Sequence, residues 1–219
     1  MTITTILDTF CAERQQHDTD ARARDNSKFR VSDAGKCRLM RYWKRQGKPM
    51  DPHYTPEGLR AMHVGILIHN WIQAVIKNAG IALAIEQQLE DKHRIGHLDA
   101  LVDIDGQRIL YDFKTVNGKK WFYLEKNNFR PDLQHICQII TYAEMLADFP
   151  DQMNIIYLNR DTINMAECNV ILGIWQDKVK RDWDILITSW ERKQSPAQTT
   201  EPWECGYCGY QDRCPYKNK

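Results

Sequence analysis

The sequence predicts an α/β protein in which a mixed central sheet is flanked by helices. Two runs of alternating apolar and polar residues meet at Asp105-Gly106, a dipeptide typical of a two-residue β-hairpin turn. Apolar residues recur at helical spacing over 56–79 and again over 131–147. Strand-like and helix-like segments thus alternate along the chain, which is the pattern of an α/β fold.

The other elements follow from the same periodicities and from turn residues. In chain order we expect a helix at 3–17, a polar linker at 18–30, a basic helix at 33–46, a helix at 56–79, a strand at 82–90, the hairpin at 95–115, a helix at 131–147, strands near 153–159 and 165–172, and a helix at about 174–193. The last segment is polar and then rich in cysteine. A chain of 219 residues is long enough for a single domain with a real core.

Composition favours a globular cytoplasmic protein. Hydrophobic residues make up 42% of the chain and charged residues 27%, and the apolar runs are too short to span a bilayer. The first residues lack the charged start and apolar block of a secretory signal. With a net charge of only +1, nucleic-acid binding would depend on local basic patches. The chain has no phosphate-binding loop of the G-x-x-x-x-G-K-[ST] type, so a helicase motor would have to be a partner.

A two-residue turn at Asp105-Gly106 sets the register of the hairpin. Stepping outwards from the turn, Asp99 comes to lie opposite Asp112, and His97 opposite Lys114. One face then carries an apolar layer of Leu98, Ala100, Val102, Ile104, Ile109, Tyr111 and Phe113. The other face carries the two aspartates and Lys114.

The opposed aspartates predict a divalent-metal site. Like charges directly opposite each other in a ladder are destabilising, so Asp99 and Asp112 need either full exposure to water or a cation between them. Mg²⁺ and Mn²⁺ bind carboxylate oxygens and retain water. Lys114 lies on the same face and could orient or deprotonate an attacking water, and the carbonyl of Thr115 could add a ligand. The alternative is a solvated hairpin face without chemistry.

The helix at 131–147 adds polar residues that could flank this site. Gln134, Gln138 and Tyr142 are four residues apart and form one ridge. Such a ridge is commonly the solvent face of an amphipathic helix. Here it could instead lie beside the metal and touch the phosphate backbone.

In this order, the motifs resemble the PD-(D/E)xK nuclease superfamily and, within it, the RecB-like exonucleases. His69 in HVGILIHNWIQAVI matches the upstream histidine of the metal site, and Asp99 in GHLD matches the GxxD aspartate. Asp112 and Lys114 match the (D/E)xK pair, with Asp in place of the commoner Glu. The resemblance implies a restriction-endonuclease-like fold. It also implies a site in which His69, Asp99, Asp112 and Thr115 hold the metal.

The same resemblance extends to the helix at 131–147. Gln138 and Tyr142 match the QxxxY element, which in the family lies near DNA. The catalytic residues it implies are Asp99, Asp112, Lys114, Gln138 and Tyr142.

Cysteines give a second, independent signal. Three close the chain as Cys205-x2-Cys208-x5-Cys214, and Cys37 lies far upstream on the basic segment. This spacing indicates metal or redox chemistry rather than disulfides, and both zinc and iron–sulfur clusters accept four thiolates. Cys137 and Cys168 lie in apolar patterns and are expected in the core.

The resemblance favours an iron–sulfur cluster, of the [4Fe–4S] type, over zinc. Iron–sulfur members of the RecB-like group carry one cysteine ahead of the nuclease core and three after it. Together with the nuclease motifs, this order is similar to the CRISPR-associated RecB-like exonucleases of the Cas-four type. The resemblance covers most of residues 32–216 and implies one nuclease domain over 1–219, with a cluster subregion (31–48 and 203–216) around a 56–195 core.

For this family we expect Mg²⁺- or Mn²⁺-dependent exonuclease action on single-stranded DNA, probably from the 5′ end in CRISPR adaptation, with CRISPR integration proteins as possible partners. Expected DNA-binding residues are Lys36, Arg38, Arg41, Lys119 and Lys120. Tyr42 and Trp43, interleaved with the first patch, suit base stacking. Two alternatives stay open. One is a phage or viral recombination or genome-processing nuclease, and the other is a non-catalytic DNA-end-binding subunit.

Overall fold

The structure is a computed structural model that describes residues 2–24, 26–50, 54–199 and 202–216. The chain forms two compact units. The sheet unit consists of Arg30–Gly35 and Val64–Lys180, and the cysteine unit consists of Met1–Phe29, Lys36–His63 and Arg181–Lys219.

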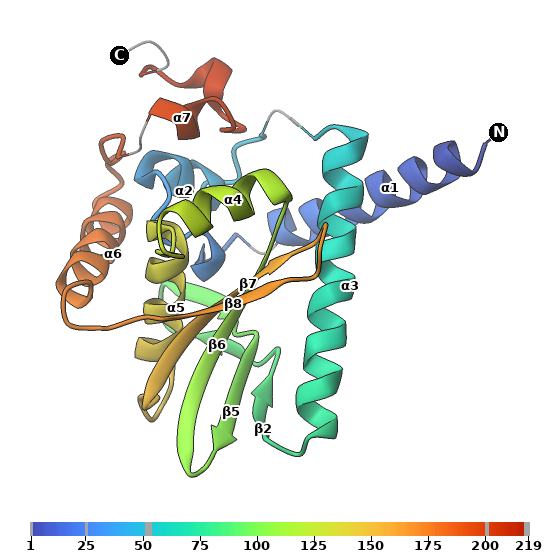
Figure 1. Cartoon of the computed structure of the whole chain (residues 1–219). Coiled ribbons are helices and arrows are strands. Elements are labelled where there is room, and N and C mark those ends of the chain that lie inside the picture. The colour runs from blue at the N-terminus through green and yellow to red at the C-terminus, as the bar shows by residue number, and fades with distance from the viewer. Residues whose placement is uncertain (1, 25, 51–53, 200–201, 217–219) are drawn as a thin grey trace. The chain divides into compact units, whose positions relative to one another are not determined.

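The sheet unit is built on a five-stranded mixed sheet, which Figure 1 shows in green to orange. In the order β2-β5-β6-β7-β8, the strands are Ala82–Ile85, Ala100–Ile104, Gln107–Val116, Gln152–Asn159 and Met165–Asn169. Strands β6 and β7 are parallel, and the other neighbours are antiparallel. The predicted mixed α/β fold, with helices flanking a sheet, is confirmed.

Two helices cover the two faces of this sheet (Figure 1). On one face Ile72 of α3 (Pro56–Asn78) packs into the main apolar cluster with Ala100, Val102, Ile109, Phe113 and Leu158. Because side chains alternate along a strand, Asp112 and Lys114 point to the opposite face. Helix α5 (Leu133–Met145) contacts β6 and β7 there. The side of β6 that carries Asp112 and Lys114 is therefore covered by α5.

The hairpin between β5 and β6 has the predicted register. Ile104 pairs with Gln107, and Ala100 pairs with Tyr111. Both turn residues have positive φ, 54° at Asp105 and 80° at Gly106, as a two-residue type I′ turn requires.

The pairing of His97 with Lys114 was wrong. His97 ends β4 (Arg94–His97), which belongs to a separate three-stranded sheet in the order β1-β4-β3, and it pairs with Gln88 of β3 (Gln88–Glu90). Strand β1 is Phe29–Arg30. The chain changes sheets at Leu98 and Asp99. At that point the Asp99 carboxylate, rather than a backbone carbonyl, accepts the hydrogen bond from the Phe113 amide, and the ladder ends.

Two further elements differ from the prediction. The strand expected at 82–90 is broken between β2 and β3, where Glu86 has a φ of +49°. A helix, α4 (Gly118–Lys126), follows β6 in a segment for which no helix or strand was predicted. Asn117 caps this helix, since its side chain accepts a hydrogen bond from the Lys120 amide at 2.8 Å.

The cysteine unit contains helices α1 (Ile3–Arg24), α2 (Arg38–Arg45) and α7 (Pro202–Cys205), most of α6 (Gln176–Glu191), and a 3₁₀ turn at Gln211–Arg213. Helix α1 runs through much of the expected linker 18–30, whose sequence is rich in good helix formers; residue 25 lies outside the described residues. The basic helix expected at 33–46 is shorter. It is preceded by a 3₁₀ turn at Val31–Asp33 and by Gly35, whose φ is +73°.

Helix α2 packs against α6 within the cysteine unit. Arg41 pairs with Asp182 and lies 4.0 Å over the ring of Trp183. Arg45 lies over the ring of Trp190 at 4.2 Å, so the helix interface combines ion pairing with cation–π contacts.

Among the described residues, no helix is both long enough and apolar enough to cross a membrane.

Candidate active site

Asp99 stands where the chain leaves the small sheet and enters β5. Its Oδ2 accepts a hydrogen bond from the Phe113 amide at 2.7 Å, which fixes the carboxylate against β6. Burial raises the pKa of Asp99 to about 6, although Lys114 and the Phe113 amide oppose this shift. The carboxyl is thus held in place and kept largely out of water.

Asp112 lies on β6 with 1% of its surface exposed. Lys114 Nζ approaches its Oδ1 to 2.9 Å and its Oδ2 to 2.7 Å. The second approach lacks hydrogen-bond geometry, which leaves Oδ2 a buried oxygen without a hydrogen-bond donor. Burial raises the pKa of Asp112 to about 6, the Asp99 charge raises it further, and Lys114 opposes both effects.

Gln138 and Tyr142 extend this polar group from α5. The Lys114 ammonium donates to Gln138 Oε1 at 3.1 Å, and the side chain of Gln138 hydrogen-bonds Tyr142. Burial, followed by the charges of Asp112 and Asp99, raises the pKa of Tyr142 and keeps its hydroxyl protonated. The structure therefore brings the predicted catalytic residues together on one face of the sheet.

Gly96 makes room for Tyr142. A Cβ added at Gly96 would lie 2.7 Å from the Tyr142 hydroxyl oxygen, closer than real Cβ atoms come to such an atom. The hydroxyl also accepts a hydrogen bond from the His97 backbone amide. Sterics therefore explain the glycine of GHLD, since any side chain at this position would displace Tyr142.

His69 reaches the same site from α3, at the edge of the sheet face that this helix covers. Its Nδ1 lies 4.0 Å from Asp99 Oδ2, and its ring meets the edge of Phe113 at 5.9 Å between centroids. Burial lowers the pKa of His69, and the charge of Lys114 lowers it further. The neutral imidazole is the form that binds metal ions.

Thr115 follows Lys114 on β6 and pairs with Leu158 of β7. A Cβ at Gly65 would come within 2.9 Å of Thr115 Oγ1, so the glycine lets α3 approach the strand closely. The role of the Thr115 carbonyl as a metal ligand stays a prediction.

The residues fit a divalent ion by their chemistry. No three His, Cys, Asp or Glu side chains within the described parts of the chain already stand at metal-coordinating spacing. Even so, two buried carboxylates lie beside a neutral imidazole, and Asp112 Oδ2 has no hydrogen-bond donor. A hard cation would bind carboxylate oxygens beside the Lys114 ammonium, which lies 2.7 Å from Asp112 Oδ2, and would offset the repulsion between Asp99 and Asp112.

The four predicted cluster cysteines lie together in the cysteine unit. All four are half-buried free thiols. Burial raises the pKa of Cys205 and of Cys208, and the neighbouring sulfurs of Cys37 and Cys214 raise both further. Such mutual repulsion arises only between sulfurs that are near one another.

Two hydrogen bonds point at these sulfurs. Gln198 Nε2 donates to Cys205 Sγ at 3.3 Å, and the backbone amide of Tyr210 donates to Cys208. N–H donors of this kind stabilise thiolates and tune metal–sulfur clusters. The donor set of four thiols fits either an iron–sulfur cluster or a zinc ion.

The basic segment around Cys37 is not an open DNA surface. Arg41 is 2% exposed and pairs with Asp182, and Tyr42 and Trp43 are buried. The predicted DNA contact of Arg41 and the predicted base stacking were therefore wrong, because α6 covers this side of α2. Arg38 also pairs with Asp182, at 3.3 Å, while Lys36 is half-buried.

Helix α4 carries the second basic patch and shows residues that the sequence reading missed. Lys119 is exposed, while Lys120 pairs with Asp132 at 2.8 Å. Phe122 and Tyr123 are 55% and 57% exposed. The sequence signal for this surface was the run of aromatic residues between lysines. Because no helix was predicted there, nothing indicated that these side chains lie on one surface.

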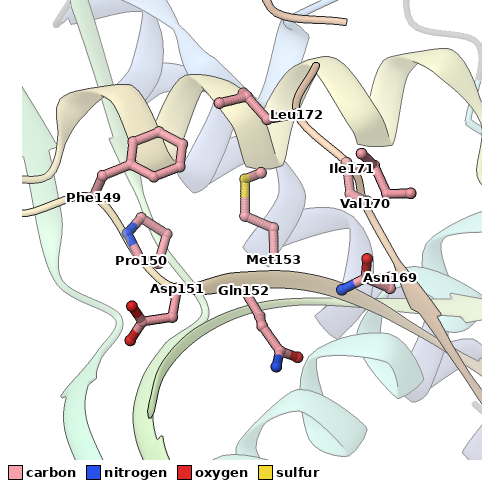
Figure 2. Close-up of a pocket in the computed structure, with 9 residues that line it drawn as sticks. All are labelled: Phe149, Pro150, Asp151, Gln152, Met153, Asn169, Val170, Ile171 and Leu172. Atoms are coloured by element: carbon pink, nitrogen blue, oxygen red, sulfur yellow. The ribbon is translucent and has the colours of Figure 1, made fainter. Parts of the chain in front are cut away.

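A pocket elsewhere in the sheet unit lacks this chemistry. Figure 2 shows its lining, in which Met153 extends among apolar side chains such as Phe149 and Leu172. Its carboxylate, Asp151, already accepts a hydrogen bond from the Arg108 amide at 2.7 Å. Its lining has one carboxylate and no second charged side chain, so the site around Asp112 is the better candidate for an active site.

Comparisons with known proteins agree with this geometry. The sequence of residues 38–215 matches the family described as the PD-(D/E)XK nuclease superfamily. No curated protein matches the sequence. The fold is similar to the crystal structure of SSO0001, with a TM-score of 0.63 and 19% identity, covering 99% of this chain and 98% of that one.

A second similar structure is an alkaline exonuclease, LHK-Exo, from Laribacter hongkongensis. Its TM-score is 0.57 at 13% identity, with 81% of this chain and 93% of that one covered. The same enzyme in complex with dAMP gives a TM-score of 0.56 at 13% identity, with coverages of 78% and 92%. At these identities the likeness concerns the fold.

The buried aspartates predict that removing one charge stabilises the metal-free protein. The folded-state pKa of Asp112, about 6, lies above its ordinary value of 3.8, so its contribution to stability is lost as pH rises through that window. At pH 8 in EDTA, we expect Asp112→Asn to raise the free energy of unfolding by about 1–3 kcal/mol. The gain should shrink toward pH 4, as measured by urea unfolding.

Asp148→Asn is the matched control, because the Asp148 side chain is 81% exposed and its loss should leave stability nearly unchanged. Equal or lower stability of Asp112→Asn at pH 8 would contradict the assigned burial cost.

Proposed function

We propose that this chain, which belongs to the PD-(D/E)XK nuclease superfamily, is a metal-dependent exonuclease that hydrolyses phosphodiester bonds of single-stranded DNA. The observation that carries the proposal is that Asp112 and Lys114 lie on the side of β6 that α5 covers, where the Phe113 amide holds the Asp99 carboxylate against the same strand. Asp112 is buried, and the Asp99 side chain is only 14% exposed. A buried pair of like charges is costly to maintain. A bound cation would neutralise the two aspartates, and an anionic substrate would pair with the lysine beside them.

Within this proposal Asp99, Asp112 and His69, with the carbonyl of Thr115, would hold Mg²⁺ or Mn²⁺. When bound, such an ion lowers the pKa of its water and stabilises the charge that develops on phosphorus. His69 is suited to this role because it is neutral and hydrogen-bonds the Phe113 backbone through its ring. A ring fixed in this way presents its other nitrogen in a defined direction.

Lys114 is proposed to orient the attacking water and to offset negative charge on the phosphate. Its ammonium is held between Asp112 and Gln138, so its position is set before substrate arrives. Tyr142 is a protonated hydroxyl, and its raised pKa keeps it so at alkaline pH, so it can donate a hydrogen bond to a phosphate oxygen. Gln138 links the two groups and keeps their spacing.

The substrate class is supported by the structural neighbours. One is named an alkaline exonuclease, and it has been crystallised with dAMP, a deoxynucleotide. We therefore propose DNA as the substrate of this chain, and removal of nucleotides from an end as its activity. The 5′-to-3′ direction follows only from the RecB-like resemblance.

Preference for single strands is supported by the surface of α4. Lys126 lies 4.5 Å over the ring of Phe122, and Lys120 lies 4.9 Å over the ring of Tyr123. Exposed aromatic rings among lysines suit unstacked bases and their phosphates. Helix α4 begins two residues after β6 ends, and Lys120 ties it to Asp132 at the start of α5.

We propose a [4Fe–4S] cluster at Cys37, Cys205, Cys208 and Cys214, with zinc as the alternative. The mutual repulsion of the four sulfurs and the two N–H donors support a metal–thiolate centre of either kind. The cluster would join Cys37 to the C-terminal segment and act as a structural clasp. Free thiols at this spacing also favour a reducing compartment such as the cytoplasm.

The biological setting that we propose is CRISPR adaptation, where such an exonuclease would trim DNA before integration proteins capture it. A phage or viral recombination enzyme would use the same site. A non-catalytic DNA-end-binding subunit is disfavoured by the intact set of Asp99, Asp112 and Lys114, and a cleavage assay with Mn²⁺ decides between the two functions.

The first prediction of the proposed function concerns activity. With labelled single-stranded DNA and Mn²⁺, we expect Asp112→Ala and Lys114→Ala each to lower the cleavage rate by about a hundredfold or more, because each removes a group that acts on the reacting phosphate. Asp148→Ala, at an exposed position, should cleave like wild type. Equal rates for all four proteins would show that the site is wrongly assigned. DNA retained in EDTA but not degraded with Mn²⁺ would favour the end-binding function.

The second prediction concerns α4. Replacing both Phe122 and Tyr123 with Ala should weaken binding of single-stranded DNA about tenfold or more, since each stacked base contributes roughly 1–3 kcal/mol. Binding is measured by fluorescence anisotropy in EDTA, and duplex DNA should be affected less. Phe149→Ala is the control, because Phe149 is also an exposed aromatic but lies in the pocket of Figure 2. An unchanged affinity in the double variant would refute the surface.

The third prediction concerns the cluster. Protein purified without oxygen should be brown and contain about four iron and four sulfide per chain. Cys208→Ser should lose most of the iron, whereas Cys168→Ala, at a buried thiol of the sheet unit, should keep it. Removal of the cluster should lower the melting temperature, and an unchanged melting curve would refute the clasp. A colourless protein with one zinc per chain would establish the alternative.

A further inference from the structure

Helix α2 begins at a cysteine that does not cap it. The first amides of a helix have no partner within the helix, and the side chain of Ser, Thr, Asp or Asn at the N-cap position commonly supplies one. Cys37 occupies the N-cap position of α2, and its side chain makes no capping hydrogen bond. A sulfur that binds a metal together with three other thiolates could not serve as a cap. The cap for this helix must then come from another segment.

Thr199 supplies that cap from the other end of the chain. Its Oγ1 accepts a hydrogen bond from the Arg38 amide at 3.1 Å and a second from Arg38 Nε at 3.3 Å. Arg38 Nε also lies 3.3 Å from Asp182 Oδ1, which fixes the guanidinium from the side of α6. The residue directly after Cys37 is thus held to Thr199 through both its backbone and its side chain.

Gln198, the neighbour of Thr199, contacts a different cysteine. Its Nε2 donates to Cys205 Sγ at 3.3 Å. Burial raises the pKa of Cys205, and this hydrogen bond opposes the shift because it favours the thiolate. Two successive half-buried residues therefore join the start of α2, where Cys37 lies, to the first of the C-terminal cysteines.

The segment that carries Gln198 and Thr199 has no regular structure of its own. Residues 194–199 form neither helix nor strand, so side-chain contacts rather than a backbone ladder hold the end of this segment in place. Segments of this kind open at a lower free energy than helices and strands do. Opening this one removes the cap of α2 and the hydrogen bond to Cys205 in the same event.

We propose that Gln198 and Thr199 form a strap that holds the C-terminal cysteines to the helix of Cys37 and thereby controls the release of bound metal. This inference rests on the proposed function, since it concerns the proposed metal–thiolate centre, whether iron–sulfur or zinc. Both residues are positioning residues, because their contacts reach the helix of one thiolate and the sulfur of another. Arg38 then acts as the anchor of the strap.

The experiment measures how fast the full chain, purified without oxygen, gives up its metal to an excess of a coloured chelator. Bathophenanthroline with a reductant reports iron, and pyridylazoresorcinol reports zinc. We expect Thr199→Val and Gln198→Leu each to release metal about tenfold faster than wild type, the scale typical of groups that support metal ligands indirectly.

Two further variants are the controls. Thr199→Ser keeps a hydroxyl that can cap α2, and it should release metal at the wild-type rate. Gln194→Leu makes the same change as Gln198→Leu at an exposed position before the strap, and it should also behave like wild type. Equal acceleration in Thr199→Val and Thr199→Ser would overturn the proposal, since the hydroxyl would then have no role.

Melting curves separate a role in holding metal from a general role in the fold. Thr199→Val and Gln198→Leu should lose part of the increase in melting temperature that bound metal gives to wild type. A variant that merely weakened the fold would melt lower by the same amount with and without metal, and would release metal at the wild-type rate. That outcome would also overturn the proposal.

Cys208→Ser distinguishes failure of the strap from failure of the proposed metal–thiolate centre. If Cys208→Ser loses the metal while all strap variants release it at the wild-type rate, the centre stands and the strap has no role. If wild type holds neither iron nor zinc, or if Cys208→Ser retains all of the metal, the proposed centre is wrong and the strap fails with it.

Discussion

The burial of two aspartates beside one lysine is the constraint on which the rest of the sheet unit depends. Water would solvate Asp99 and Asp112 more cheaply than the protein does, as their raised pKa values of about 6 indicate. Hydrogen bonds from the Phe113 amide and the Lys114 ammonium offset part of this desolvation cost. A bound cation would offset more of it. The neighbouring elements make sense as supports for this group: α5 orients Lys114 through Gln138, and α3 brings a neutral imidazole.

The sequence predicts this site well where the reasoning is local. Asp105-Gly106 demands positive φ at two successive residues, so it sets the turn, and the turn sets the register as far as Ala100. Alternation then assigns Asp112 and Lys114 to one face without knowledge of any other element. The helical ridge of Gln138 and Tyr142 follows from spacing in the same way, although only the fold could decide whether it faces water or the sheet.

Prediction fails where a distant partner decides. The hairpin pattern continues to His97, but the chain leaves the sheet because the Asp99 side chain takes the Phe113 amide, which alternation does not encode. Arg41 reads as a DNA contact on an isolated basic helix. Its burial depends on Asp182, 141 positions later in the chain. Helix α4 was not predicted, because a glycine followed by lysines after a strand is also typical of a loop. Asn117 can be recognised as its N-cap only once the helix is known.

The two proposed ligand sets follow one physical rule. The carboxyls of the sheet unit and the thiols of the cysteine unit are groups that carry like charge when ionised, kept partly out of water and close enough to raise the pKa of a neighbour. Without a cation, each set disfavours its own ionised form. Binding a metal reverses the sign of the interaction, because the same charges that repel one another become ligands. The stability that each unit gives up in the metal-free state is therefore available as binding energy.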